Sequence, residues 1–218
     1  MRDVIRAQLK ACTAGDAGQA WSEVTALAEK EPNSNLPGSY KADGDTVKIF
    51  GFTGPITPAA VLVGLVERRQ GMTVLLTRRT ESLSSHSGQI SFPGGRIEQA
   101  DATPMGTALR ETEEEIGLAP ARVEILGRLA NYVVGTGYRI TPVVGFVDPP
   151  ERFVRDEREV AEVFEVPLEV VMKRSNYRRE HMRIKNVERS FLVLPYGEYR
   201  IWGATASILA NLRDKLSD

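Results

Sequence analysis

The sequence predicts an α+β fold in which a mixed central sheet lies between helices, an α/β/α sandwich. Three observations favour this class. Short apolar runs with strand character recur along the chain, and single segments with helical periodicity stand between some of them. Strand runs next to single helices are typical of a sheet that is covered on both faces. The length of 218 residues suits one ordinary domain with extensions, or two small ones.

The composition excludes several classes of protein. Lys and Arg total 28 against 29 Asp and Glu, so the net charge of -1 gives no basic field for nucleic acid or an anionic membrane. The single cysteine, Cys12, excludes an internal disulfide and favours a reducing compartment. No apolar run approaches the roughly 18–20 residues that span a bilayer, and the N-terminus lacks the apolar core of a signal peptide. We therefore expect a soluble cytoplasmic protein that binds neither nucleic acid nor membranes.

Two regions of the chain differ in character. Residues 1–57 are expected to form an N-terminal helical extension, with Ile5 and Leu9 on one helix face, and then an irregular arm rich in Pro, Gly, Asn and Asp. Residues 58–218 are expected to form the main domain. Three roles stay open for the first region: it caps the sheet, it contacts a second copy of the chain in a homodimer, or it covers the active site.

The main domain should contain both strands and helices. Strands are expected at residues 60–66, 72–77, 123–133, 140–147, 163–166, 191–194 and 199–202. The first two are separated by the sequence Arg-Arg-Gln-Gly, which indicates a hairpin. Helices are expected at residues 104–116, 168–172 and 204–216.

The helix at residues 104–116 carries its own boundary signals. Thr103 is a suitable N-cap ahead of Pro104, and Gly117 is a natural C-terminal stop. With about 100° between successive residues, one side of the helix gathers the residues expected to face the core. These are Met105, Ala108, Leu109, Thr112 and Ile116.

A separate face of this helix gathers Glu111, Glu114 and Glu115, which are three or four residues apart. Like charges at this spacing cost about 0.2–0.5 kcal/mol per pair, and acids in the last turns oppose the helix dipole. A divalent cation would reverse both penalties, and oxygen ligands alone suit Mg²⁺ or Mn²⁺. The alternative interpretation is a solvated charged face, which is what most glutamate-rich helices present.

The loop ahead of the helix favours the metal. The sequence Phe-Pro-Gly-Gly ends at Gly95 and leads towards the acidic helix. Consecutive glycines, Gly94 and Gly95, let the backbone approach a ligand or ion closely, and amides in such a loop can cradle phosphate oxygens. A Gly-Gly loop that feeds a helix with three carboxylates is more specific than either feature alone.

Together these residues resemble the Nudix box, G-x5-E-x7-R-E-U-x-E-E-x-G-U, in which U is aliphatic. The match covers Arg110, Glu111, Glu114, Glu115, Gly117 and Leu118. Thr112 stands at an aliphatic position of the box. Asp101 stands where glutamate is usual, and the gap between Asp101 and Arg110 is longer than the box by one residue.

A second pattern looks like the flanking motif of the Nudix coenzyme A pyrophosphatases, L-L-T-x-R-[SA]-x3-R-x3-G-x3-F-P-G-G. Residues 75–95 match its spacing throughout, with Arg79 at the first arginine. Thr80 replaces the small residue, and Ser84 stands where the second arginine is expected. That subfamily also tolerates the longer box with Asp. The resemblance covers about residues 58–213 and implies a Nudix fold with a mixed central sheet between helices.

The resemblance implies a metal-dependent pyrophosphatase. Glu111, Glu114 and Glu115 would hold Mg²⁺ or Mn²⁺, and Glu114 or Glu115 would be the metal-linked general base. Arg110 would orient a carboxylate of the site by pairing with Asp101.

The implied substrate is coenzyme A or acyl-coenzyme A, which would be cleaved to 3′,5′-ADP and 4′-phosphopantetheine. Arg79 would contact a phosphate, and the backbone of Gly94 and Gly95 would line the diphosphate. Glu159 and Glu162 precede a strand, where several Nudix enzymes supply an extra acid. A solvated charge is the alternative for each of these two residues.

Two alternative functions stay open. Because Ser84 replaces an arginine of the subfamily motif, a hydrolase of ADP-ribose or another nucleoside diphosphate derivative is the second enzyme hypothesis. The third hypothesis is a Nudix module that binds a nucleotide without turnover. Degenerate boxes usually accompany such modules, whereas the three glutamates of this box are all present.

Overall fold

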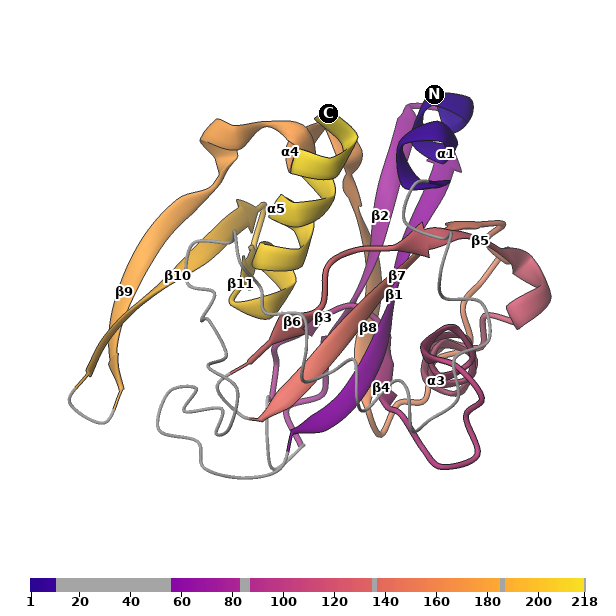
Figure 1. Ribbon diagram of the computed structural model, residues 1–218, viewed down its shortest axis with the longest axis horizontal. Coiled ribbons are helices and arrows are strands. Elements are labelled where there is room, and N and C mark those ends of the chain that lie inside the picture. Colours follow the sequence, from indigo (N-terminus) through magenta and orange to yellow (C-terminus); the bar gives the residue numbers. More distant parts are fainter. Residues whose placement is uncertain (11–55, 83–86, 135–136, 185–186, 218) are drawn as a thin grey trace.

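The computed structural model describes residues 1–10, 56–82, 87–134, 137–184 and 187–217 (Figure 1). Ser84 and the expectations for residues 11–55, including the irregular arm, lie outside these ranges. Among the described residues, no helix is both long enough and apolar enough to cross a membrane.

A mixed central sheet forms the body of the molecule and confirms the predicted fold class. Its strands are β1 (Thr57–Arg68), β2 (Gly71–Arg79), β3 (Ile90–Ser91), β4 (Gly94–Arg96), β5 (Val123–Arg128), β6 (Tyr132–Val133), β7 (Tyr138–Val147) and β8 (Val160–Pro167). Their order is β3-β2-β1-β7-β5, with β4 paired to β1, β6 to β7 and β8 to β2. β1 and β7 are parallel, and β1 and β2 form the predicted antiparallel hairpin. This arrangement places β4, which carries the glycine pair, against the first half of β1.

The pleat of the sheet divides its apolar side chains between two cores. On β1, Val63 and Leu65 belong to one core, whereas Leu62 and Val66 belong to the other, as expected for side chains that alternate between faces. The first core is covered by α1 (Arg2–Lys10), α4 (Leu168–Met172) and α5 (Ala204–Ser217). The second core is covered by α3 (Pro104–Ile116). Figure 1 shows α3 and α5 on opposite sides of the sheet.

Helix α1 is part of the first core. Ile5 and Leu9 are buried there, which confirms that they share an apolar face. The helix contacts β5 and α5. At least this part of residues 1–57 therefore packs against the main body, and the boundary at residues 57 and 58 stays a proposal.

A second, smaller sheet contains β9 (Arg178–Ile184), β10 (Val187–Tyr196) and β11 (Tyr199–Trp202), all antiparallel. Figure 1 shows β9 and β10 as a ribbon that extends away from the central sheet. The sequence predicts the apolar parts of β10 and β11. It does not predict β9, whose charged sequence Arg-Arg-Glu-His-Met-Arg-Ile has little strand character.

Short helical turns complete the described part of the chain. Pro120–Arg122 forms a 3-10 turn before β5, and Arg174–Asn176 forms another before β9. The single strand expected at residues 123–133 is divided into β5 and β6. The pairing of β5 with β7 already shifts register between Ile125 and Gly127, so the chain does not continue as one regular strand.

Candidate active site

Helix α3 begins and ends where the sequence predicts. The Thr103 side-chain oxygen accepts a hydrogen bond from the Gly106 N–H at 3.1 Å, and Pro104 occupies the first turn. Gly117 ends the helix with a φ of 69°, and its N–H donates to the Glu113 carbonyl at 2.8 Å. The caps fix where the helix begins and ends, and its packing against β1 and β4 sets the direction of each glutamate.

The glycine pair of β4 meets two of these glutamates. The Gly94 N–H donates to Oε2 of Glu115 at 3.1 Å. A Cβ on Gly95 would lie 2.3 Å from Oε2 of Glu111, so any side chain there would displace that carboxylate. Gly94 has a φ of 146°, and a Cβ there would lie 2.4 Å from the carbonyl oxygen of Ala60 in β1. Both glycines are therefore required for the close approach of β1, β4 and α3.

The three predicted metal ligands differ in their exposure. Glu115 is buried, with 6% of its surface exposed, Glu111 is half-buried, and Glu114 is exposed. The predicted acidic face is thus not separate from the buried side of the helix. The reason is that α3 packs against both β1 and β4, which encloses Glu115 beside the core residue Ile116. Burial raises the pKa of Glu115 to about 8, and it also raises the pKa of Glu111.

Arg110 and Asp101 form the predicted pair. Nε and Nη2 of Arg110 donate to the two carboxylate oxygens of Asp101, each at 3.0 Å. Oδ2 of Asp101 also accepts from the hydroxyl of Thr107 and the N–H of Glu98, each at 2.9 Å. These bonds, that from Arg110 first, lower the pKa of Asp101 to about 2. The aspartate at the acidic position of the box therefore holds an arginine in this structure.

The same guanidinium reaches two of the glutamates. Nη2 of Arg110 donates to Oε1 of Glu111, and Nη1 donates to Oε2 of Glu114, each at 3.0 Å. Arg110 also donates to the carbonyl of Arg96, the residue after the glycine pair, at 3.3 Å. Arg110 thereby ties α3 to β4 and fixes the orientation of Glu111 and Glu114.

Arg79 lies on the other side of Glu115. Its Nη1 is 3.9 Å from Oε1 of Glu115. Its Nε is buried and has no hydrogen-bond partner among the residues that the structure describes. About a quarter of the side chain, 27%, is exposed. Arg79 thus places positive charge at the edge of the carboxylate cluster, and its contact with a phosphate stays a prediction.

The two acids that precede β8, Glu159 and Glu162, have different surroundings. Glu159 is exposed, and its backbone lies beside the residue that follows Arg79, because the N–H of Thr80 donates to the Glu159 carbonyl at 2.9 Å. Its negative charge also contributes, after burial, to the raised pKa of Glu111 and Glu115. Glu162 instead forms an ion pair with Arg78 at 3.1 Å and accepts a hydrogen bond from the hydroxyl of Tyr199 at 2.7 Å. Glu162 is therefore engaged away from the glutamates of α3, whereas the role of Glu159 as an extra acid stays a prediction.

Arg96, whose carbonyl accepts a hydrogen bond from Arg110, is a neighbour of the site that the sequence patterns do not identify. Its Nε donates to the hydroxyl of Tyr138 at 2.9 Å, and its guanidinium lies 5.3 Å from the centre of the Tyr138 ring. Its position directly after Gly95 is the signal that could have marked it. The side chain of Arg96 is thus directed to Tyr138 in β7.

The carboxylates fit a divalent cation by their chemistry. Glu111 and Glu115 both border the glycine pair, are withdrawn from water and have raised pKa values, so a nearby cation would offset the cost of keeping them ionised. Oxygen atoms are the ligands that Mg²⁺ and Mn²⁺ prefer. Within the described ranges, no three Asp, Glu, His or Cys side chains are grouped as a ready metal site. Glu114 is turned to Arg110, so its role as a third ligand stays a prediction.

Comparison with known proteins identifies the surrounding domain. The family model described as the NUDIX domain matches residues 56–185. An uncharacterized Nudix hydrolase, NudL, of Enterobacter sp. (strain 638) is 39% identical over 154 residues, which cover 71% of this chain and 80% of the relative. NudL of Yersinia pestis (strain Pestoides F) is 37% identical over 159 residues, covering 73% of this chain and 79% of the relative. A crystal structure of a MutT/nudix family protein from Enterococcus faecalis has the same fold, with a TM-score of 0.51 and 15% identity over 92% of this chain and 70% of that chain.

Proposed function

The chain belongs to the Nudix family and is a hydrolase that acts on pyrophosphate bonds, and we propose that its substrate is coenzyme A or acyl-coenzyme A. The products would be 3′,5′-ADP and 4′-phosphopantetheine or its acylated form. Nudix hydrolases generally use divalent metal ions, and we propose Mg²⁺ or Mn²⁺ for this protein. The observation that carries the proposal is the meeting of Glu111 and Glu115 at the backbone of Gly94 and Gly95.

The proposed ligands of the cation are Glu111, Glu114 and Glu115. A cation held there supplies positive charge that neutralises the diphosphate and lowers the pKa of the attacking water. Glu111 and Glu115 are withdrawn from solvent, whereas Glu114 is exposed and would have to leave Arg110 in order to join them. Arg110 acts as the residue that orients the carboxylates.

The protein itself must bind the substrate and accept the proton of water. Glu114 and Glu115 are the proposed general bases, and Glu159 is proposed as a further acid. Arg79 and the backbone of Gly95 would contact the phosphates, since both lie next to the carboxylate cluster. Membership of the Nudix family does not by itself identify the general base or the residues that contact the phosphates, so these roles are part of the proposal.

The preference for coenzyme A is supported by the sequence motif at residues 75–95. Its first part forms β2, which ends at Arg79, and its last two residues, Gly94 and Gly95, begin β4 at the site. In between, Gly88 has a φ of 65°, and a Cβ there would lie 2.5 Å from Oε1 of Glu81. The motif glycine therefore allows the chain to turn back towards the glycine pair.

The proposal is tested by product analysis on two substrates side by side, coenzyme A and ADP-ribose. The full chain is incubated with each substrate in Mg²⁺ or Mn²⁺, with a metal-free control. We expect metal-dependent release of 3′,5′-ADP from coenzyme A, well above cleavage of ADP-ribose. Preference for ADP-ribose would overturn the proposal of coenzyme A as the substrate, but not the proposal of metal-dependent pyrophosphate hydrolysis. Cleavage of neither would favour another nucleotide or binding without turnover.

The ADP-ribose alternative rests on one residue. Ser84 stands where the coenzyme A motif has its second arginine, and it lies outside the described residues. We expect the variant Ser84→Arg to change neither kcat nor KM for coenzyme A. A lower KM in that variant would show that the missing arginine limits recognition of this substrate.

A further inference from the structure

The loop that carries Glu159 is held at one end by α3. The N–H of Asp156 donates to the carbonyl of Glu115 at 2.8 Å, and the N–H of Val154 donates to the carbonyl of Ile116 at 3.1 Å. Because these carbonyls belong to the last turn of the helix, they have no partner within it. The loop thus supplies hydrogen-bond donors to the last carbonyls of α3, one of which belongs to Glu115.

The other end of the loop is held by Thr80. The N–H of Thr80 donates to the carbonyl of Glu159, and its hydroxyl donates to the carbonyl of Arg158, each at 2.9 Å. The hydroxyl of Ser82 donates in turn to the hydroxyl of Thr80 at 3.1 Å. Only 9% of Thr80 is exposed, so the two carbonyls are held by a buried residue with few other conformations.

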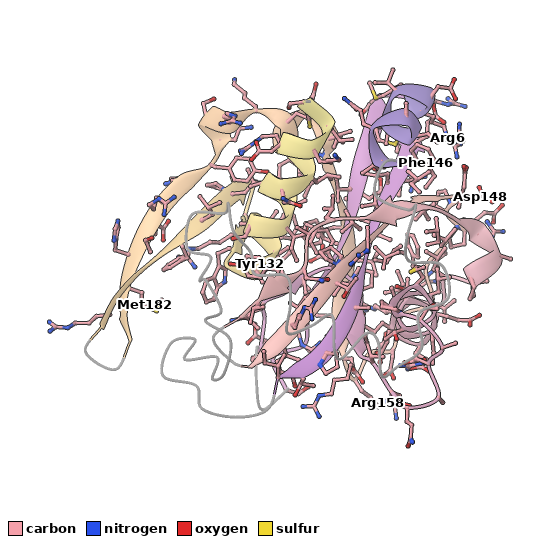
Figure 2. All side chains as sticks on the ribbon, in the orientation of Figure 1. Arg6, Tyr132, Phe146, Asp148, Arg158 and Met182 are labelled. Carbon is pink, nitrogen blue, oxygen red and sulfur yellow. The ribbon has the colours of Figure 1, made fainter. Side chains whose placement is uncertain are left out.

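Within the loop, Asp156 holds the same stretch: its Oδ1 accepts from the N–H of Arg158 at 2.9 Å, and its carbonyl accepts from the N–H of Glu159 at 3.0 Å. The side chain of Arg158 is 88% exposed, and among the residues that the structure describes it bonds to Asp156 of the same loop. Figure 2 shows Arg158 projecting from the end of the molecule. Asp156 holds the N–H groups of Arg158 and Glu159 from within the loop, whereas Thr80 joins their carbonyls to β2. The strand pairing of β2 with β8 begins immediately afterwards, with Arg79 opposite Val160.

We propose that Thr80 is a positioning residue, which holds the backbone of Arg158 and Glu159 so that the carboxylate of Glu159 stays at the carboxylate cluster. The inference rests on the proposed hydrolase function. It assigns a specific task to the hydroxyl of Thr80, which stands at a motif position where the hydroxyl is not a general requirement. Small displacements of a group that acts on the substrate are costly in rate, so the hydroxyl should affect kcat more than KM.

The test compares variants of Thr80 in the full chain, with coenzyme A, ADP-ribose and Mg²⁺. Thr80→Val keeps the shape of the side chain and removes the hydrogen bond to Arg158. We expect kcat to fall about tenfold or more while KM stays within about twofold. Thr80→Ser should restore kcat. If Thr80→Val does not fold, Thr80→Ala replaces it. The control is Thr73→Val, which removes a hydroxyl bonded to Glu165 at the other end of β2 and should keep wild-type kcat.

A double-mutant cycle shows whether Thr80 acts through Glu159. We expect Glu159→Gln to lower kcat, and Thr80→Val to have little further effect in that background, because two residues of one unit are not additive. Three results would each overturn the inference: additive effects of the two substitutions on kcat, an unchanged kcat in Glu159→Gln, or an unchanged kcat in Thr80→Val. In each case, turnover by the wild-type protein would leave the proposed function in place. A wild-type protein that cleaves neither substrate would instead overturn the proposed function.

Discussion

Gly95 shows how a single position can shape the site. The carboxylate of Glu111 occupies the space that a Cβ of residue 95 would take. Sequence reasoning could predict that the backbone comes close to something here, since consecutive glycines permit it. It could not show that the close neighbour is a carboxylate of the same chain. That requires the docking of α3 on β4, which depends on contacts along the whole helix.

We predict that Gly95→Ala lowers turnover by roughly a hundredfold, because the added methyl group displaces the carboxylate of Glu111 from its place. Steady-state kinetics with coenzyme A and Mg²⁺ measure this. The matched control is Gly106→Ala in the exposed first turn of α3, where a Cβ would lie 3.5 Å from Oγ1 of Thr103, an ordinary contact. Equal activity of the two variants would contradict the steric argument.

Asp101 gives a pH-dependent prediction. Its pKa is about 2 in the folded protein and 3.8 in the ordinary case. Its bonds to Arg110 and Thr107 therefore stabilise the fold fully above pH 3.8, and this contribution is lost as the pH falls towards 2. We predict that Asp101→Asn lowers the free energy of unfolding by about 1–3 kcal/mol at pH 7. In urea unfolding, the difference in the free energy of unfolding between wild type and Asp101→Asn should decrease between pH 5 and pH 2.5. A difference that stays constant over this range would show that the ionised carboxylate of Asp101 is not its cause.

Helix α3 is the element that the sequence describes best. Its cap residues and its bounds are local signals, and both ends agree with the structure. The pairing of Arg110 with Asp101 could also be predicted, because the family pattern places both residues. The burial of Glu115 could not, since a helical projection gives directions and not the neighbours that cover them. β9 was missed for a related reason: its charged residues form a strand only because β10 pairs with them.

At the scale of this helix, we predict that Thr103→Ala lowers the free energy of unfolding by about 1 kcal/mol, because the Gly106 N–H loses its acceptor. Thr103→Ser retains the side-chain oxygen that accepts from Gly106, so its free energy of unfolding should be close to that of wild type. Chemical unfolding of the three proteins measures both values. If the alanine variant matches the serine variant, the cap does not contribute to stability.

At the level of the whole molecule, α1 packs near the end of β1, whereas β4 pairs with the beginning of that strand. The guanidinium of Arg2 lies 4.3 Å from the centre of the Phe146 ring, and Nη2 of Arg6 is 2.9 Å from Oε1 of Glu124. Figure 2 shows Arg6 and Phe146 together at one end of the molecule and Arg158 at the other. A helical periodicity predicts that Ile5 and Leu9 share a face. It does not reveal which surface they bury, because the contact spans most of the chain.

We predict that Leu9→Ala, at a fully buried position, lowers the free energy of unfolding by about 2–5 kcal/mol. Val4→Ala on the exposed side of the same helix should change it by less than about 0.5 kcal/mol. Thermal and urea unfolding of both variants give the comparison. Similar small effects in both would mean that α1 does not contribute to the core in solution.

We propose that Glu115 helps to hold the divalent cation on which hydrolysis depends. The most direct measurement is Mn²⁺ binding, by the loss of the free Mn²⁺ signal in electron paramagnetic resonance, together with turnover of the same samples. Glu115→Gln should keep the fold and the acceptor for the Gly94 N–H, yet weaken Mn²⁺ binding about tenfold or more and lower turnover by roughly a hundredfold. Glu113→Gln, on an exposed position of the same helix, should retain both. Wild-type Mn²⁺ affinity and turnover in Glu115→Gln would show that Glu115 does not hold the cation.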